Sequence, residues 1–398
     1  MKIMIIDDDP FVLRMLARQL ARLGCDQVLP FSSARDALAA MSEGDTSVGL
    51  TICDLQMPEM DGVQFVGELG RIGYSGALAV ASGEDGRILQ TAEKLARAHG
   101  LHVLGALRKP VALDELRDLL ARSAAHRAAI PRQMRPAYPP EDLRRALAEG
   151  ELVNHYQPQI DVATGALVGV ETLVRWHHPR DGMVFPDQFI STAEEHDLID
   201  DVTHVVLTEA LRQARRWDDA GLDLRVAVNV SMDNLAALGF PDFVAASAHD
   251  AGVTPTHLVL EVTESRLMKD QRAPLEILTR LALKRIGLSI DDFGTGHSSL
   301  AQLRDFPFDE LKVDRSFIHG ASRDSALSAI VVASCGMARQ LGMSVVAEGV
   351  EDRADWDYVR ACGCHRAQGY FMGRPMPAPD LQSWMVTWEG RCGELGLA

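Results

Sequence analysis

The chain has 398 residues, of which 24% are charged and 47% are hydrophobic, and a formal net charge of −16. This length suits two or three domains, and the composition is that of a folded globular protein rather than a disordered one. The negative charge argues against binding to nucleic acid polymers or anionic membranes, and no apolar run reaches the roughly 18 residues of a membrane helix. The acidic N-terminus lacks a signal peptide pattern, so we expect a cytoplasmic protein.

The first 120 residues or so alternate short β-branched runs with amphipathic stretches, which is the pattern of βα units. A helix is predicted at 10–24, because this segment opens with proline and stops at glycine. These features predict a parallel α/β domain over residues 1–122. A linker is predicted over 123–140, which is rich in arginine, alanine and proline. The strands of the domain are expected at 2–7, 49–54, 77–82 and 102–107.

Five polar residues stand at the ends of these strands or just after them: Asp7, Asp8, Asp54, Ser82 and Lys109. Carboxyl ends of parallel strands share one edge of a sheet, so these groups can converge on one crevice. Three carboxylates there would bind one Mg²⁺ or Mn²⁺ ion, and the metal with Lys109 could neutralise a phosphoryl group on Asp54. Any one of these residues alone would be an ordinary strand-end residue, but five in this order are unlikely to be coincidental.

In these five positions the domain resembles a response-regulator receiver. The resemblance implies a doubly wound, flavodoxin-like fold and phosphorylation of Asp54 by a cognate histidine kinase. It also implies metal binding by Asp7, Asp8 and Asp54, and contacts of Ser82 and Lys109 with the phosphoryl group. Receivers usually carry an aromatic switch residue three positions before the lysine, where this chain has Ala106. How phosphorylation would switch the conformation of the domain is therefore left open.

From 141 to 391 the βα pattern resumes with eight strand-like runs, which indicates a TIM (β/α)8 barrel. The first two runs are joined by the short turn 161–165, which has no room for a helix. An antiparallel first strand and a modified barrel are therefore predicted. Residues 392–398 are expected to form a C-terminal tail. The predicted strands are 152–160, 166–176, 224–231, 257–265, 288–294, 310–318, 344–351 and 365–371.

Polar side chains stand at the ends of these barrel strands, and a barrel gathers such ends on one face. Acids crowded together repel one another unless hard cations bind them, and oxygen ligands favour Mg²⁺ or Mn²⁺ over zinc. Adjacent Asp291 and Asp292 suit two metals, and a metal pair with Lys312 nearby favours phosphodiester hydrolysis. The side chains are Glu171, Asn229, Glu261, Glu264, Asp291, Asp292, Lys312, Glu348, Glu351 and Gln368.

The motifs YQP, ETLVRW, NVS, EVTES, DDFGTGHSSL, LKVDRSFI, VVAEGVE and AQGYFMGRP occur in the order found in EAL-domain phosphodiesterases, which residues 141–391 resemble. The resemblance implies two-metal hydrolysis of cyclic di-GMP to linear pGpG, modulated by the receiver. It implies catalytic roles for Lys312, Glu264 and Glu351. One metal would be bound by Glu171, Asn229, Glu261 and Asp291, and the second by Asp291, Asp292 and Glu348. Substrate contacts would come from Gln157, Leu173, Arg175, Asp314 and Gln368.

This segment departs from the family pattern at Thr172, which replaces an alanine, and at His297, which replaces a tyrosine. His177 and His178 are not expected to share a metal, because neighbouring side chains on a strand point to opposite faces. A homodimer or larger homo-oligomer is expected from the resemblance. The alternative is a catalytically silent cyclic di-GMP sensor or protein-interaction module. Silent relatives are expected to lack metal ligands or the lysine, and all of them are present here.

Overall fold

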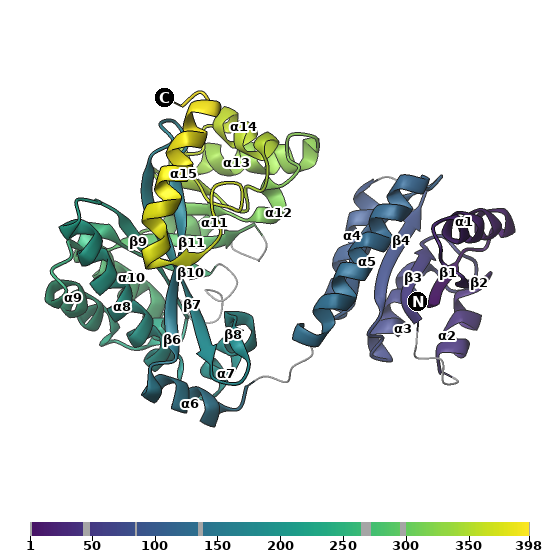
Figure 1. Cartoon of the computed structure of the whole chain (residues 1–398), viewed down its shortest axis with the longest axis horizontal. Helices are drawn as coiled ribbons and strands as arrows, with labels where there is room; N and C mark the ends of the chain where they lie inside the picture. The colour runs from purple at the N-terminus through teal and green to yellow at the C-terminus, as the bar shows by residue number, and fades with distance from the viewer. Residues whose placement is uncertain are drawn as a thin grey trace. The chain divides into compact units, whose positions relative to one another are not determined.

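The structure is a computed structural model that describes residues 2–42, 48–83, 86–133, 138–263, 272–294 and 300–397. It divides into two compact units, Met1–Arg135 and Pro136–Ala398, which are described separately (Figure 1). Among the described residues, no helix is long and apolar enough to cross a membrane. Glu264 and His297, which the sequence analysis singled out, lie outside the described residues.

The N-terminal unit is a parallel sheet in the order β2-β1-β3-β4-β5 with helices on both faces (Figure 1). Side chains alternate along each strand, so Met4 and Ile6 join one apolar cluster while Ile3 and Ile5 join another. This confirms the doubly wound fold. The strands are β1 Lys2–Ile6, β2 Gln27–Phe31, β3 Val48–Asp54, β4 Ala77–Ser82 and β5 His102–Arg108. The helices are α1 Pro10–Arg22, α2 Ala34–Ser42, α3 Gly62–Arg71, α4 Gly86–Ala98 and α5 Leu113–Gln133.

Two elements of this unit add to the sequence prediction. The strand β2 lies at the sheet edge, contains Pro30 and is only partly buried, so it lacks the apolar run that marks the other four. The helix α5 continues to Gln133, through much of the segment predicted as a linker. Arginine and alanine dominate this segment and are strong helix formers, so the composition that suggested a linker also supports a helix.

The C-terminal unit is a closed barrel of eight strands within the described residues, formed by β6, β7 and β9 to β14. The strand β6 is antiparallel to both of its neighbours, β7 and β14, which confirms the modified barrel. The barrel strands are β6 Leu152–Asp161, β7 Leu167–His178, β9 Arg225–Val230, β10 Leu258–Thr263, β11 Gly287–Phe293, β12 Glu310–Val313, β13 Ser344–Ala347 and β14 Arg366–Ala367. Two short strands, β8 Gly182–Val184 and β15 Met376–Pro377, pair with β7 and β6.

Helices surround this barrel (Figure 1). They are α6 Pro140–Glu149, α7 Ile190–Glu195, α8 Ile199–Asp219, α9 Phe240–Asp250, α10 Arg272–Leu283, α11 Leu300–Asp305, α12 Arg315–Ile318, α13 Ser325–Gln340, α14 Arg353–Cys362 and α15 Leu381–Glu394. Short 3₁₀ turns lie at Pro186–Gln188, Asn234–Ala236, Pro255–His257 and Ala378–Asp380.

Three predicted strands are shorter in the structure than their apolar runs. The run 310–318 gives only the strand Glu310–Val313, because Asp314 caps the helix α12 through a 2.9 Å bond from the Ser316 amide to its Oδ1. Phe317 and Ile318 are therefore buried as helical residues. Likewise, only four residues of the run 344–351 are in the strand β13, and only two residues of the run 365–371 are in β14. The residues beyond these strands form the loops of the carboxyl face.

Candidate functional site

Asp7, Asp54 and Lys109 meet at the carboxyl edge of the N-terminal sheet. Nζ of Lys109 lies 2.6 Å from Oδ2 of Asp7 and 2.7 Å from Oδ2 of Asp54. Carboxylate oxygens of Asp7, Asp8 and Asp54 lie within 4.8 Å of one another. Ser82 is fully buried at the end of β4, the strand that pairs with β3 beside Asp54. All five predicted residues thus stand at one edge of the sheet.

Burial and the neighbouring charges shift the pKa values of Asp7 and Lys109 at this edge. Burial raises the pKa of Asp7 despite its hydrogen bond from Lys109. Burial alone would lower the pKa of Lys109, but hydrogen bonds to Asp54 and Asp7 outweigh it and the pKa is raised. The lysine is therefore held as a cation beside two carboxylates at the carboxyl edge of the sheet.

A second charged cluster surrounds Lys312 inside the barrel. The Lys312 side chain is completely buried, and four carboxylates, three from the strands β7, β10 and β11 and one directly after β13, surround its ammonium. Nζ lies 2.7 Å from Oε1 of Glu348, 2.9 Å from Oε2 of Glu261, 3.3 Å from Oδ1 of Asp291 and 3.5 Å from Oε2 of Glu171. An ammonium has three N–H donors, so it cannot satisfy four carboxylates. The cluster carries surplus negative charge.

Amide side chains hold Glu171 in place. Nδ2 of Asn229 donates to Oε1 of Glu171 over 2.8 Å, and Nε2 of Gln368 donates to the other carboxylate oxygen. Gln368 also donates to Gln157 over 3.0 Å and accepts from Nε2 of Gln159 over 3.1 Å. The sequence analysis missed Gln159. It lies two residues after Gln157 on β6, so the period of two in a strand places both on the same face.

The cluster shifts the pKa values of its members in opposite directions. Burial, together with the charges of Asp291 and Glu171, raises the pKa of Glu348 to about 8 although Lys312 opposes the shift. Burial and then Glu171 also raise the pKa of Glu261. Burial acts in the same direction on Glu171, but Lys312, Gln368 and Asn229 outweigh it and lower its pKa. Protons therefore compete with cations for part of this cluster.

The acidic side chains of the barrel form two groups with the spacing of a metal site. Oxygens of Glu171, Glu261 and Asp291 lie within 4.8 Å of one another, as do oxygens of Asp291, Asp292 and Glu348, so Asp291 belongs to both groups. Oε1 of Glu261 is buried and has no hydrogen-bond partner among the described residues. A buried carboxylate oxygen without a partner is costly unless a ligand binds it. An all-oxygen set of this kind suits a hard divalent cation.

Asp292 has a backbone conformation that is uncommon for a residue other than glycine. Its φ of 55° lies in the left-handed region, and its N–H donates to Oδ1 of Asp291 over 2.8 Å. Burial and the charge of Asp291 raise the pKa of Asp292 to about 6. This turn places the second aspartate beside Glu348 rather than on the opposite face of the strand.

A cavity of about 260 Å³ opens on this cluster. The sequence analysis missed two of its lining residues, Arg315 and Tyr370, which directly follow Asp314 and the Gln368–Gly369 pair. Arg175 does not line this cavity, because it donates to the Val174 carbonyl and lies 5.0 Å over the Phe185 ring. The cavity is lined by Gln157, Glu171, Leu173, Asp292, Asp314, Arg315, Glu348, Gly349, Glu351, Gln368, Gly369 and Tyr370.

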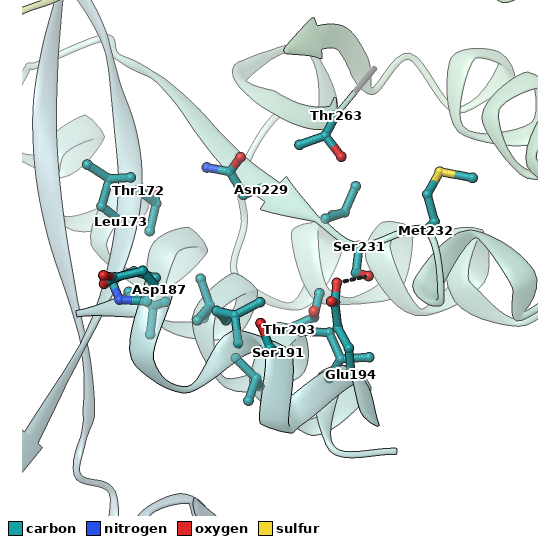
Figure 2. A pocket seen from close by; sticks show the side chains of 17 residues that line it. Thr172, Leu173, Asp187, Ser191, Glu194, Thr203, Asn229, Ser231, Met232 and Thr263 are labelled. Atoms are coloured by element: carbon teal, nitrogen blue, oxygen red, sulfur yellow. Dashed lines mark hydrogen bonds between the residues drawn. The ribbon is translucent and has the colours of Figure 1, made fainter. Parts of the chain in front are cut away.

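A larger cavity of about 480 Å³ lies between β7, β9 and the helices α7 and α8 (Figure 2). Leu173 lines both cavities. Apolar side chains form most of the wall, with Asp187 and Glu194 at its polar part. Oγ of Ser231 donates to Glu194 over 2.9 Å. The hydroxyl of Thr172 is buried here without a partner among the described residues.

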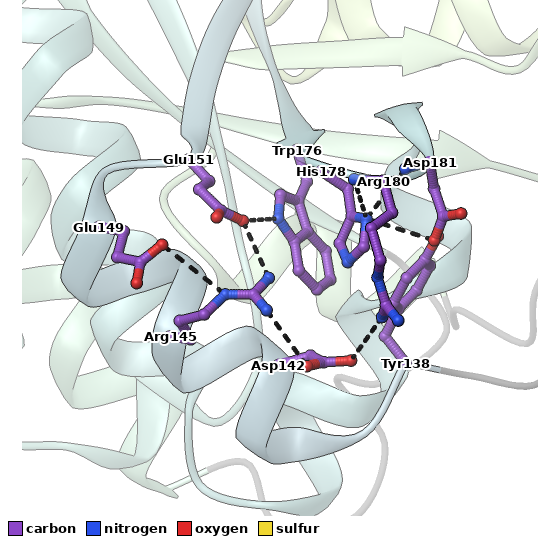
Figure 3. Close-up of polar contacts among 9 residues, drawn as sticks. All are labelled: Tyr138, Asp142, Arg145, Glu149, Glu151, Trp176, His178, Arg180 and Asp181. Atoms are coloured by element: carbon purple, nitrogen blue, oxygen red, sulfur yellow. Dashed lines mark hydrogen bonds and ion pairs between the residues drawn. The ribbon is translucent and has the colours of Figure 1, made fainter.

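Side chains from the first residues of the C-terminal unit, beginning with Tyr138, hold the end of β7 beyond Arg175 (Figure 3). The Tyr138 hydroxyl donates to Oδ2 of Asp181 over 3.0 Å, and its ring lies 4.7 Å from that of Trp176. Glu151 accepts from Nε1 of Trp176 over 2.7 Å and pairs with Arg145 at 3.3 Å. These contacts hold the strand that carries Glu171 and Leu173.

His177 and His178 follow Trp176 and point to opposite faces, since His177 is exposed and His178 is buried. Nδ1 of His178 accepts the backbone N–H groups of Arg180 and Asp181 over 3.3 and 3.1 Å (Figure 3). The two histidines therefore do not form a metal pair, and His178 orders the turn between β7 and β8.

Comparisons with known proteins bear on both units. Residues 3–121 match the response regulator receiver domain, and residues 140–375 match the EAL domain. The cyclic di-GMP phosphodiesterase RocR of Pseudomonas aeruginosa is 32% identical over 379 residues, which cover 95% of this chain and 96% of RocR.

The bifunctional diguanylate cyclase/cyclic di-GMP phosphodiesterase MucR of the same organism is 46% identical over 241 residues. These cover 60% of this chain but 35% of MucR, so this chain spans about a third of that relative. A solved structure of the P. aeruginosa MucR phosphodiesterase in complex with c-di-GMP is 45% identical, with a TM-score of 0.58. It covers 61% of this chain and 98% of that one.

Metal affinity should rise with pH. The pKa of Glu348 is raised to about 8, so below that pH the carboxyl group must release a proton before it binds a cation. Between about pH 8 and about pH 6 we expect Mg²⁺ affinity to fall by up to about ten-fold per unit for each proton displaced. Calorimetry in an Asp8→Asn background, which removes a carboxylate from the acidic group of the N-terminal unit, measures this. Glu348→Gln should weaken the pH dependence, and equal wild-type affinities at both pH values would contradict the assignment.

Proposed function

The chain belongs to the EAL-domain family and carries a response-regulator receiver domain before its EAL domain, and from this premise we propose that it hydrolyses cyclic di-GMP. The observation that carries the proposal is the cluster of four carboxylates around the buried ammonium of Lys312. The names of RocR and MucR, which include this activity, support the choice of substrate.

Two Mg²⁺ or Mn²⁺ ions would be held by the barrel cluster. Glu171, Asn229, Glu261 and Asp291 would hold the first, and Asp291, Asp292 and Glu348 would hold the second. When bound, such ions supply an acidified water and offset the negative charge of the phosphodiester. Lys312 keeps its proton, because four carboxylates raise its pKa against the effect of burial. It would orient the attacking water and stabilise the negative charge that develops on the phosphoryl oxygens.

The substrate would span both cavities. The smaller cavity faces the acids and would hold the reacting phosphodiester, with Gln157, Asp314 and Gln368 around it. The larger one has apolar walls for the faces of a guanine, and Asp187 and Glu194 can accept hydrogen bonds from its N–H edge. The unpaired hydroxyl of Thr172 would be a further partner.

Hydrolysis of one phosphodiester would open the ring. The water oxygen attacks phosphorus, the bond from phosphorus to the ribose 3′-oxygen breaks, and this oxygen takes up a proton. The phosphate stays on the 5′-oxygen, so the product is linear pGpG. Glu351 lines the cavity and would serve in proton transfer. Glu264, which lies outside the described residues, is proposed to have a catalytic role.

The purified full-length chain with Mg²⁺ or Mn²⁺ should convert cyclic di-GMP to pGpG, followed by liquid chromatography. Glu171→Gln keeps the size of the side chain but removes a charged ligand, so we expect kcat to fall by at least about 100-fold. Glu276→Gln is the matched control, because Glu276 is exposed on α10 and lines neither cavity. Tight binding of cyclic di-GMP without product would instead indicate a sensor.

The receiver would control this activity through Asp54. We expect a cognate histidine kinase to phosphorylate Asp54, with one metal held by Asp7, Asp8 and Asp54. Ser82 and Lys109 would contact the phosphoryl group. Lys109 already lies 2.7 Å from Asp54, so its cation would shift from the carboxylate to the phosphoryl oxygens.

Acetyl phosphate with Mg²⁺ should add one phosphoryl group to the wild-type chain and none to Asp54→Asn, as measured by intact mass. Turnover of cyclic di-GMP should then differ between the phosphorylated and unphosphorylated wild type, because only differential stabilisation of two states can transmit the signal. Asp54→Asn should be insensitive to the phosphodonor. Equal turnover of the fully phosphorylated and unphosphorylated wild type would contradict receiver control.

A further inference from the structure

A buried carboxylate, Asp355, joins two loops on the carboxyl face of the barrel. It lies in the first turn of α14 and is 1% exposed. Its Oδ2 accepts the backbone N–H of Glu351 over 3.1 Å and lies 2.9 Å from Nδ1 of His319. Its Oδ1 accepts the backbone N–H of Gly320 over 3.1 Å. One side chain thus binds the segment after β12 and the segment after β13.

These two segments form one wall of the 260 Å³ cavity. The segment after β12 contributes Asp314 and Arg315, and the segment after β13 contributes Gly349 and Glu351. The two segments touch directly at Gly349 and Arg315. Glycine has no Cβ, and a Cβ added at position 349 would lie only 2.1 Å from Cβ of Arg315. Gly349 also has a φ of 62°, so only glycine fits this approach without strain. The wall depends on how closely the two loops are held.

The helix α14 does not need Asp355 in order to begin. Asp352 is its N-cap, and Oδ1 of Asp352 accepts the Asp355 N–H over 2.8 Å. Oxygens of Asp352 and Asp355 and a ring nitrogen of His319 lie within 4.8 Å of one another, which would permit a cation. Both Asp355 oxygens already have partners, however, so the group is satisfied by its own hydrogen bonds. The burial of this carboxylate is thus explained by the loops that it binds.

The pKa shifts of His319 and Asp355 agree with these hydrogen bonds. The hydrogen bond to Asp355 raises the pKa of His319, and the charges of Glu351 and Asp352 act in the same direction. Burial alone would raise the pKa of Asp355, but hydrogen bonds from His319, Gly320 and Glu351 outweigh it and lower the pKa. The carboxylate is therefore the favoured form, and it is the form that accepts three hydrogen bonds.

We propose that Asp355, oriented by His319, is a positioning residue that holds Glu351 and the Asp314–Arg315 segment at the wall of the substrate cavity. This inference rests on the proposed phosphodiesterase function. Loss of the junction would let the two loops separate, and a displacement of about 1 Å near a reacting group can cost up to about 100-fold in rate. Asp355 itself lines neither cavity and would act only through the loops.

Asp355→Asn preserves the shape of the side chain but replaces an acceptor oxygen with an N–H donor. We expect KM for cyclic di-GMP to rise about five-fold and kcat to fall about ten-fold, with the thermal midpoint changed by only a few degrees. His319→Ala should show a weaker form of the same defect. His319→Asn should restore wild-type constants, because the amide nitrogen of asparagine can occupy the position of Nδ1.

Asp324→Asn is the matched control. Asp324 is the N-cap of α13 and accepts the N–H groups of Ala326 and Leu327, but it lines neither cavity. The same change from aspartate to asparagine at the start of a neighbouring helix should leave KM and kcat unchanged. An equal loss of activity in Asp324→Asn would overturn the proposal, since the loss of a carboxylate charge near the start of any helix would then suffice. Wild-type constants in Asp355→Asn would overturn it as well.

Amide hydrogen exchange tests the junction separately from the chemistry. Exchange at Glu351 and Gly320 should be faster in Asp355→Asn than in the wild type, and it should stay slow in Asp324→Asn. Unchanged exchange at both amides would refute the junction. If the wild-type chain does not hydrolyse cyclic di-GMP, the proposed function fails whatever the exchange result. In that case weaker cyclic di-GMP binding by Asp355→Asn would still support the positioning role, and unchanged binding would refute it.

Discussion

The barrel site depends on one buried ammonium surrounded by more carboxylates than it can satisfy. Lys312 contacts Glu171, Glu261, Asp291 and Glu348, all within 3.5 Å. Buried charges are stable only when they are paired and hydrogen-bonded, and three N–H donors cannot pair with four carboxylates. Burial and then the neighbouring carboxylates raise the pKa values of Glu261 and Glu348, and one buried oxygen of Glu261 has no hydrogen-bond partner among the described residues. This imbalance is the physical reason for expecting metals there.

The strands and loops of the barrel surround this charged cluster and form the walls of the cavity beside it. The antiparallel strand β6 brings Gln157 beside Glu171 on β7, and the amides around Glu171 fix its position. The loops after β12 and β13 extend from the same two strand ends that carry Lys312 and Glu348, and Asp355 joins them. The wall of the cavity and the charged cluster are thus formed by neighbouring residues of the same strands and of the loops that follow them.

Much of this architecture follows from the sequence. Apolar runs with polar residues at their ends predicted a parallel α/β domain and a barrel, and the family resemblance added the doubly wound fold and part of the site residues. Strand lengths were overestimated at 310–318, because Phe317 and Ile318 are apolar for burial in a helix rather than in a strand. The edge strand β2 was not predicted, since Pro30 and partial burial leave it without an apolar run. The extension of α5 was not predicted, since a segment rich in arginine, alanine and proline is typical of a linker as well as compatible with a helix.

Features that depend on side-chain distance could not be read from the sequence. Gln159, Arg315 and Tyr370 are near motif residues, yet only the structure places them beside the acids or in the cavity wall. Arg175 belongs to a motif but is directed to the Val174 carbonyl and the Phe185 ring. Opposite pKa shifts of Glu171 and Glu348 arise from their different partners, which sequence position does not reveal.

Anomalous diffraction from crystals of the chain grown with Mn²⁺ would test the central claim most directly. We predict two manganese peaks in the barrel, both within bonding distance of Asp291. One would also be bound by Glu171, Asn229 and Glu261, and the other by Asp292 and Glu348. Absence of manganese from this cluster, with all four carboxylates still gathered around Lys312, would contradict the account, because the ammonium alone would then balance the site.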